Sequence, residues 1–258
     1  MGIIGGKSDP INESYYSQAE LLEKIVFWLF IVGGVLSFAL LFVQEPEYHD
    51  IMQVLFLCTS LLLFSLNHFF HLFLFPKAEN KRVSDFMSAA FDISLIEDRS
   101  RGYYNNSETG SIRRAAFQLL ENTFFTRSIT SLMLKVIRPI SIAYFLIWLP
   151  CLVYRGSDLD WLVVFSSVLF SEGVFSKWIK LEWLKHKSSA FYDDVYRILN
   201  TTDKGFDVSA IEKLIMYEKL KATASILLCS KTFNQHNERL SSEWNAIRSS
   251  LEKKEEDK

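Results

Sequence analysis

The chain has 258 residues, a formal net charge of −2 and a mean hydropathy of +0.12, although 22% of its residues are charged. A net charge this close to zero excludes a nucleic-acid binder that works through bulk positive charge. The three cysteines show no CxxC or metal-ligand spacing, which argues against a disulfide framework and a zinc site. A positive mean hydropathy beside so many charges indicates that apolar and charged blocks are segregated along the chain.

Two long apolar runs follow a polar N-terminal segment, residues 1–24, which we expect to be cytosolic. Ile25–Val43 and Ile51–Phe75 are long enough to cross a bilayer as helices, which takes about 20 mainly apolar residues. The acidic turn Gln44–Asp50 separates them. The pattern predicts a transmembrane hairpin over residues 25–75.

Four polar side chains of the second run recur at spacings that place them on one helix stripe: Gln53, Ser60, Asn67 and His71. Polar groups inside a membrane span cost free energy, so each needs a partner or a function. One interpretation is hydrogen bonding between packed helices. The other is a polar seam that lines a water path when several copies assemble.

The middle segment, residues 76–138, is rich in Lys and Arg and is predicted to be cytosolic and helical. We expect Pro76 to end the second span and Val83–Ile96 to form a short amphipathic helix. Gly102 marks a loop, and a second helix is predicted to begin near Ser111 and to run toward the third span.

The middle segment also carries candidate ligand groups, because arginine binds phosphate bidentately and tyrosine offers a stacking face. These candidates are Arg99, Arg101, Tyr103, Tyr104, Arg113 and Arg114. The alternative is a basic juxtamembrane segment that lies against anionic lipid headgroups. The sequence contains no HExxH, Walker A, GxSxG or GxGxxG motif. We therefore predict no catalytic residue, no metal site and no cofactor.

A second apolar hairpin is predicted over residues 139–175. Its arms, Ile140–Tyr154 and Trp161–Phe175, each reach roughly 22 Å as a helix, against a hydrocarbon core of about 30 Å. Pro150 is expected to bend the first arm. The hairpin either spans the bilayer or is re-entrant, and the polar turn Arg155–Asp160 favours spanning.

The last apolar run adds two polar residues to the candidate seam. Ser171 and Glu172 fall near one side of this run, and Glu172 is the only acid inside an apolar run. An intramembrane acid is a functional candidate by default. With His71 it could also form the proton or ion relay of a small transporter.

The tail, residues 176–258, is predicted to be cytosolic. We expect the last span to continue as a helix to a stop at Asn200–Gly205, and a second long helix from about Ser209. Apolar residues late in this helix keep the spacing of a coiled-coil or bundle seam, called the tail seam: Leu240, Trp244, Ile247 and Leu251. That seam serves either oligomerisation or packing back onto the middle segment. The positive charges flank the apolar runs on one side, which places both termini in the cytosol and the chain in the inner membrane.

Two apolar hairpins around a charged helical middle, with a helical tail, resemble the four-transmembrane effector proteins of bacterial antiphage defence systems, CBASS-type or similar. The resemblance covers the layout of the chain. Its distinctive residues are Phe91-Asp92 through Gly102-Tyr103-Tyr104-Asn105-Asn106, and then Glu121-Asn122-Thr123-Phe124-Phe125. It implies a pore-forming effector that oligomerises and permeabilises or depolarises the inner membrane in abortive infection. The signal would be a nucleotide second messenger or a cytosolic partner protein.

The sequence therefore predicts an all-α integral membrane protein with four transmembrane helices in two hairpins, a cytosolic helical middle and a C-terminal helical pair. The expected partners are the lipid bilayer and further copies of the chain, without nucleic acid. The expected function is a non-enzymatic membrane effector. The alternatives are a membrane tether for a cytosolic partner and a small ion or solute transporter.

Overall fold

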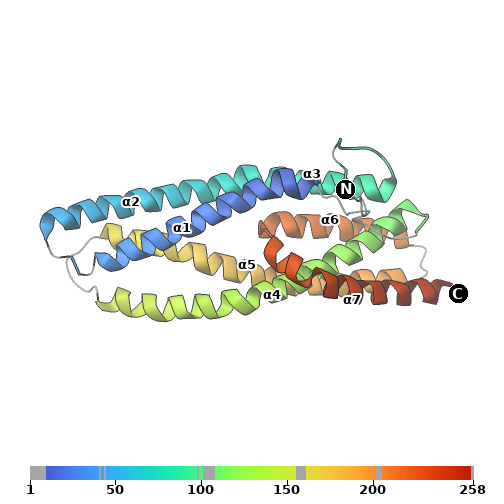
Figure 1. Ribbon diagram of the computed structural model, residues 1–258. Coiled ribbons are helices and arrows are strands. Elements are labelled where there is room, and N and C mark those ends of the chain that lie inside the picture. The colour runs from blue at the N-terminus through green and yellow to red at the C-terminus, as the bar shows by residue number, and fades with distance from the viewer. Residues whose placement is uncertain are drawn as a thin grey trace, which may run out of the picture.

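The computed structural model describes residues 10–40, 42–43, 45–97, 99–100, 108–154, 161–201 and 205–256, with side chains left out at 147–154, 161–174 and 254–256. These described residues form helices and connections and contain no strand. The prediction of an all-α protein is therefore confirmed. The molecule is elongated, and both termini lie at the end where α3, α6 and α7 gather (Figure 1).

The first two helices form a hairpin, called hairpin 1 below. A π-helix, η1 (Asn12–Tyr16), leads into α1 (Ser17–Ala39), so part of the predicted polar N-terminal segment is already helical. The returning helix, α2 (Pro46–Phe69), begins on a proline, whose missing N–H costs nothing in a first helical turn. Phe56 of α2 packs against Leu40 at the far end of α1.

The helix of the second apolar run continues past Pro76, so the end of the second span expected there is not marked by a helix break and stays a prediction. A π-helix, η2 (Phe70–Leu74), joins α2 to α3 (Phe75–Phe91) without interruption. A proline inside an α-helix clashes with the carbonyl four residues earlier, which here belongs to Leu72. Leu72 lies in η2, where the wider π pattern replaces the α pattern, and this lets the helix continue.

The predicted short helix over Val83–Ile96 has the wrong limits, because α3 begins earlier and ends earlier. It ends at Asp92, which has a left-handed backbone (φ 52°), a common way to stop a helix. The chain then folds back over α3, since the N–H of Leu95 donates to the Ser88 hydroxyl at 3.1 Å.

Two long helices form the spine of the molecule. α4 (Ser111–Tyr154) begins where the sequence predicts, and it stays helical through Pro139 and Pro150. α5 (Trp161–Asn200) returns beside it and ends at the predicted stop. Each helix extends from the end of the molecule where hairpin 1 turns into the region of α6 and α7 (Figure 1).

The tail is not one long helix after Ser209, so that prediction is also wrong. α6 (Phe206–Ala224) ends at Ser225, whose backbone is left-handed (φ 48°), and α7 (Ser230–Glu256) begins five residues later. The tail seam packs back onto the chain. Its members Leu240 and Trp244 are buried, and the Trp244 ring lies 5.9 Å from that of Phe124 in α4.

The main hydrophobic core joins α3, α4, α5, α6 and α7. Its fully buried members include Phe86, Phe117, Leu120, Leu184 and Tyr217. Hairpin 1 extends beyond this core, together with the adjoining ends of α4 and α5 (Figure 1). The five-helix core is called the helical bundle below.

Three helical runs among the described residues are long and apolar enough to cross a membrane: Asn12–Ala39, Pro46–Phe91 and Ser111–Leu146. Only 11% and 6% of the most apolar windows of the first two is buried, so these helices turn large apolar side chains outward. Soluble monomers rarely expose apolar patches of this size, and lipid would cover them. The fourth predicted span, Trp161–Phe175, falls almost wholly on residues whose side chains are outside the described part.

Two tryptophans test whether hairpin 1 faces lipid while the bundle core does not. Trp28 in α1 is 65% exposed, whereas Trp244 in α7 is 4% exposed inside the bundle core. In variants that keep one tryptophan, reconstituted into vesicles, we expect brominated lipid acyl chains to quench Trp28 strongly and Trp244 hardly at all. Equal quenching of both would contradict the placement of α1 in lipid.

Candidate functional site

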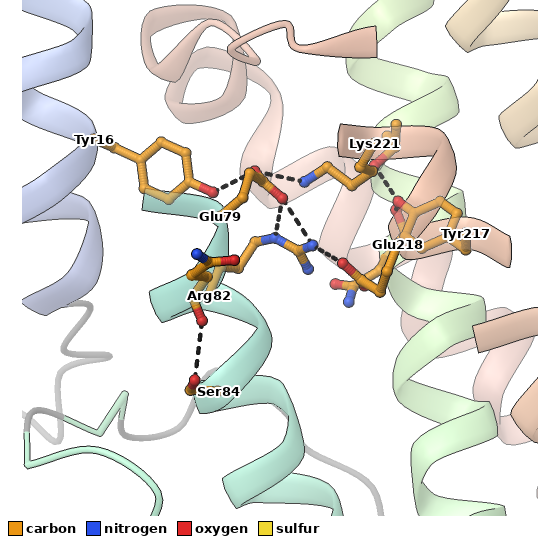
Figure 2. Close-up of polar contacts among 10 residues, drawn as sticks. Tyr16, Glu79, Arg82, Ser84, Tyr217, Glu218 and Lys221 are labelled. Atoms are coloured by element: carbon orange, nitrogen blue, oxygen red, sulfur yellow. Dashed lines mark hydrogen bonds and ion pairs between the residues drawn. The ribbon is translucent and has the colours of Figure 1, made fainter. Parts of the chain in front are cut away.

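A cluster of four charged side chains joins α3 to α6 inside the bundle (Figure 2). Glu79 and Arg82 lie three residues apart on one face of α3, and Glu218 and Lys221 lie three residues apart on α6. Glu79 and Lys221 are buried, with 7% and 9% of their surface exposed. Charged side chains are seldom buried unless they are paired, so the pairing within this cluster is what permits it.

Glu79 is at the centre of the cluster. Its Oε2 accepts a hydrogen bond from Arg82 Nε at 2.9 Å, and its Oε1 accepts one from Lys221 Nζ at 3.3 Å. The Tyr16 hydroxyl of η1 donates to the same Oε1 at 2.5 Å. Arg82 also donates to Glu218 through Nη2. The cluster therefore ties η1, α3 and α6 together at one carboxylate.

The charges set the protonation state of this carboxylate. Burial alone would raise the pKa of Glu79, but the positive charges of Arg82 and Lys221, with the hydrogen bonds from Arg82 and Tyr16, together lower it to about 2. Burial and the neighbouring Arg82 together lower the pKa of Lys221. A general base works best with a pKa near the operating pH, and Glu79 is far from that range. The geometry suits a structural lock better than proton transfer.

Tyr217 attaches α6 to α4 beside the charged cluster. Its hydroxyl lies 2.7 Å from Thr126 Oγ1 and donates to the Asn122 carbonyl at 3.2 Å. Tyr217 is fully buried, and burial raises its pKa. The two hydrogen bonds satisfy a polar group that would be costly to bury alone. α6 is thus held by charge on the α3 side and by hydrogen bonds on the α4 side.

The predicted ligand arginines are engaged within the chain. Arg99 donates through Nη2 to the Ser88 carbonyl at 2.9 Å. Arg113 donates through Nε to Glu108 Oε2 at 3.0 Å, and Arg114 donates to the Glu108 carbonyl at 3.0 Å. The guanidinium of Arg113 also lies over the rings of Phe117 and Phe206. The candidates Arg101, Tyr103 and Tyr104 lie outside the described residues.

The predicted polar stripe of α2 is brought together only in part. Ser60 is buried on the inner face of hairpin 1, where its hydroxyl donates to the Phe56 carbonyl at 2.9 Å. Gln53 is half-buried, but Asn67 is exposed. The half-buried His71 lies in η2, and its Nδ1 is 2.7 Å from the Ser225 hydroxyl. The side chains of Ser171 and Glu172 lie outside the described residues.

The charged cluster was not predicted from the sequence, although the chain carries a signal for it. Glu79 and Arg82 interrupt the apolar face of α3, which also contains Phe75 and Phe86. A charged pair inside an apolar stripe predicts buried partners elsewhere. Those partners lie more than 130 residues away in α6, and only the fold identifies them.

The described residues contain no group of three His, Cys, Asp or Glu side chains arranged to hold a metal ion. A hollow of about 300 Å³ lies between the N-terminal segment and the loop after α3, and it is lined by Tyr15, Lys81, Leu95 and Glu97 among others. Lys81 lies over the Tyr15 ring at 5.6 Å. The residues that line this hollow include no nucleophile paired with a base.

Replacing the central carboxylate should destabilise the bundle. Glu79→Gln leaves the buried Lys221 and the half-buried Arg82 with one acid between them, and breaking a buried ion pair from one side costs about 3–5 kcal/mol. Chemical denaturation of the purified chain measures this loss. Glu243→Gln is the matched control, because it breaks an exposed pair with Arg239 (2.5 Å), worth about 0.5 kcal/mol or less. Equal losses would contradict the lock.

The low pKa of Glu79 predicts acid sensitivity. Because the folded pKa is about 2 and the ordinary value is 4.5, ionised Glu79 stabilises the fold above pH 4.5. This contribution, on the order of 3 kcal/mol, is lost as the pH falls from 4.5 toward 2. We expect the stability gap between wild type and Glu79→Gln to shrink through that window. A gap that stays constant would show that Glu79 does not titrate there.

Comparison of the chain with protein-family models, with curated proteins and with solved structures finds no match.

Proposed function

We propose that this chain is a multi-pass inner-membrane protein with four spans in two hairpins and both termini in the cytosol. In this proposal, it permeabilises or depolarises the membrane on a cytosolic signal, as a homo-oligomer and without catalysing a reaction. The biological role would be antiphage defence through abortive infection, as the resemblance to four-transmembrane defence effectors implies.

The continuity of the helices is the observation that carries this proposal. Helices α2, η2 and α3 form one run from Pro46 to Phe91, and α4 and α5 each run unbroken from the bundle toward the turn end of hairpin 1. A stiff helix that is packed at one end carries a displacement to its other end. Rearrangement of the bundle would therefore move the spans directly.

The inner face of hairpin 1 supports a water path. Ser60 is buried there, and its hydroxyl donates to a carbonyl of its own helix rather than to α1. The oxygen can still accept a hydrogen bond from water. Gln53, two turns away, is half-buried on the same stripe. This part of the predicted seam would line the path, whereas Asn67 would not.

The arginines of the middle segment suggest how the signal would enter, because a phosphate ligand would compete for them with their present partners in the chain. Arg99 holds the Ser88 carbonyl, and Arg113 and Arg114 hold Glu108. A nucleotide phosphate offers a charged, bidentate acceptor that binds arginine more strongly than a neutral carbonyl does. Binding would therefore release Arg99 and Arg114 from the carbonyls that they hold, and the loss of the Arg114 contact would loosen the start of α4.

The tether alternative rests on an exposed apolar face of α6. Val208, Ile211 and Ile215 are 75%, 42% and 63% exposed, although α6 lies in the bundle. Such a face on a helix outside the predicted spans suits a protein partner. A tether would bind through this face and leave the membrane sealed.

Membrane potential distinguishes the two functions and tests the seam. On induced expression we expect wild type to depolarise cells, reported by a potential-sensitive dye, and Ser60→Ala to reduce the effect several-fold. Ser65→Ala is the matched control, because Ser65 makes the same bond to a carbonyl of its own helix, at 2.8 Å, from an exposed position.

Each outcome decides a separate point. A wild-type chain that inserts into the membrane and never changes the potential would contradict the effector function and favour the tether. Equal activity of Ser60→Ala and Ser65→Ala would contradict the water path alone. Immunoblotting of the membrane fraction normalises the amount of each protein.

A further inference from the structure

The segment between α6 and α7, Ser225–Cys229, is called the linker below, and its neighbouring residues pack into different cores. Ile226 is 8% exposed and belongs to the core of the helical bundle. Leu227 is 2% exposed and belongs to a separate small cluster with Ala19 of α1 and Phe70 and Phe75 of the second helical run. The linker therefore lies between the helical bundle and the start of α1, and it packs against both.

Polar contacts hold the start of the linker to η2 and the first residue of α7 to α1. At its start, the Ser225 hydroxyl lies 2.7 Å from Nδ1 of His71 in η2. Just after its end, the Ser230 hydroxyl donates to Glu20 of α1. These contacts join residues 154 and 210 positions apart in the sequence, so they depend on the tail being docked.

Both partners at the first contact have unusual backbones. Ser225 has positive φ, which costs free energy in a residue other than glycine and persists only where surrounding contacts hold it. His71 lies in a π-helix, a form that is frequent at functional sites and that changes the face on which later residues lie. The hydrogen bond therefore joins two local distortions of the backbone, the left-handed end of α6 and the π-helix that precedes Pro76.

We propose that the linker restrains hairpin 1 in its resting arrangement. The Leu227 side chain fills a socket formed by Ala19, Phe70 and Phe75, and the Ser225–His71 hydrogen bond, called the latch below, holds the start of the linker. This inference rests on the proposed function, because it names how the bundle would regulate the membrane helices. Withdrawal of Leu227 from its socket loosens the packing of α1 against η2 and α3, since the socket is built from residues of all three. Rearrangement of the bundle would withdraw it, because Ile226 is anchored in the bundle core.

Hydrogen–deuterium exchange of the full chain in phospholipid nanodiscs tests the restraint without any assay of permeability. We expect Leu227→Ala to raise amide exchange about tenfold or more in the α1 base and η2, residues 16–23 and 68–76. Leu228→Ala is the matched control, because Leu228 is adjacent and packs against the bundle core instead. Equal exchange in these two windows for both variants overturns the restraint.

Ser225→Ala tests the latch without removing a buried apolar side chain. It should raise exchange in η2 more than in α1, and it should add nothing when His71 is already replaced by Ala. Additive effects of the two substitutions would overturn the Ser225–His71 coupling.

The same variants separate the restraint from the proposed function. If both are correct, Leu227→Ala depolarises cells at lower expression than wild type does, and Leu228→Ala does not. If no variant depolarises cells while the exchange contrast persists, the effector function fails and the restraint stands. If wild type depolarises and Leu227→Ala behaves like Leu228→Ala in both assays, the restraint fails and the effector function stands.

Discussion

The ion pairs around Glu79 constrain the rest of the structure, because buried charges tolerate little displacement. Glu79 must remain within reach of Arg82, Lys221 and the Tyr16 hydroxyl at the same time. Moving α6 away from α3 would leave at least one of these charges buried without its partner, at a cost of several kcal/mol. The tail is therefore fixed in register against the helix that continues into the predicted membrane span, and η1 is fixed with it through Tyr16.

Hydrophobic periodicity was sufficient to predict α4 and α5, since the apolar faces of these two helices pack against each other. The start of α4 at Ser111 and the end of α5 at Asn200 coincide with ordinary signals of loop and stop residues. The continuation through Pro76 was not predictable in the same way. A π-helix absorbs the proline, and nothing in the local sequence distinguishes that solution from a break.

The candidate site was harder to predict, because its residues look like surface charges in an amphipathic pattern. Glu218 and Lys221 lie three residues apart, as exposed ion pairs often do, and only the contacts with α3 show that Lys221 is buried and Glu218 half-buried. The break at Ser225 has the same origin. Ile226 and Leu227 are consecutive, and a continuous α-helix would separate two such side chains by only about 100°. Packing into two different cores requires the chain to leave the helix there.

The charged cluster and the linker hold the same continuous helix at two places. His71 and Glu79 are eight residues apart, or about 12 Å along a helix. A single attachment lets a helix pivot, whereas two attachments on its length fix its tilt. Both are made by the tail, through Lys221 and Ser225 respectively. Because α2 continues from this helix into hairpin 1, the position of α6 sets the direction in which hairpin 1 leaves the bundle. Loss of the linker contact alone would keep the cluster as a pivot, so hairpin 1 would tilt about Glu79 rather than detach.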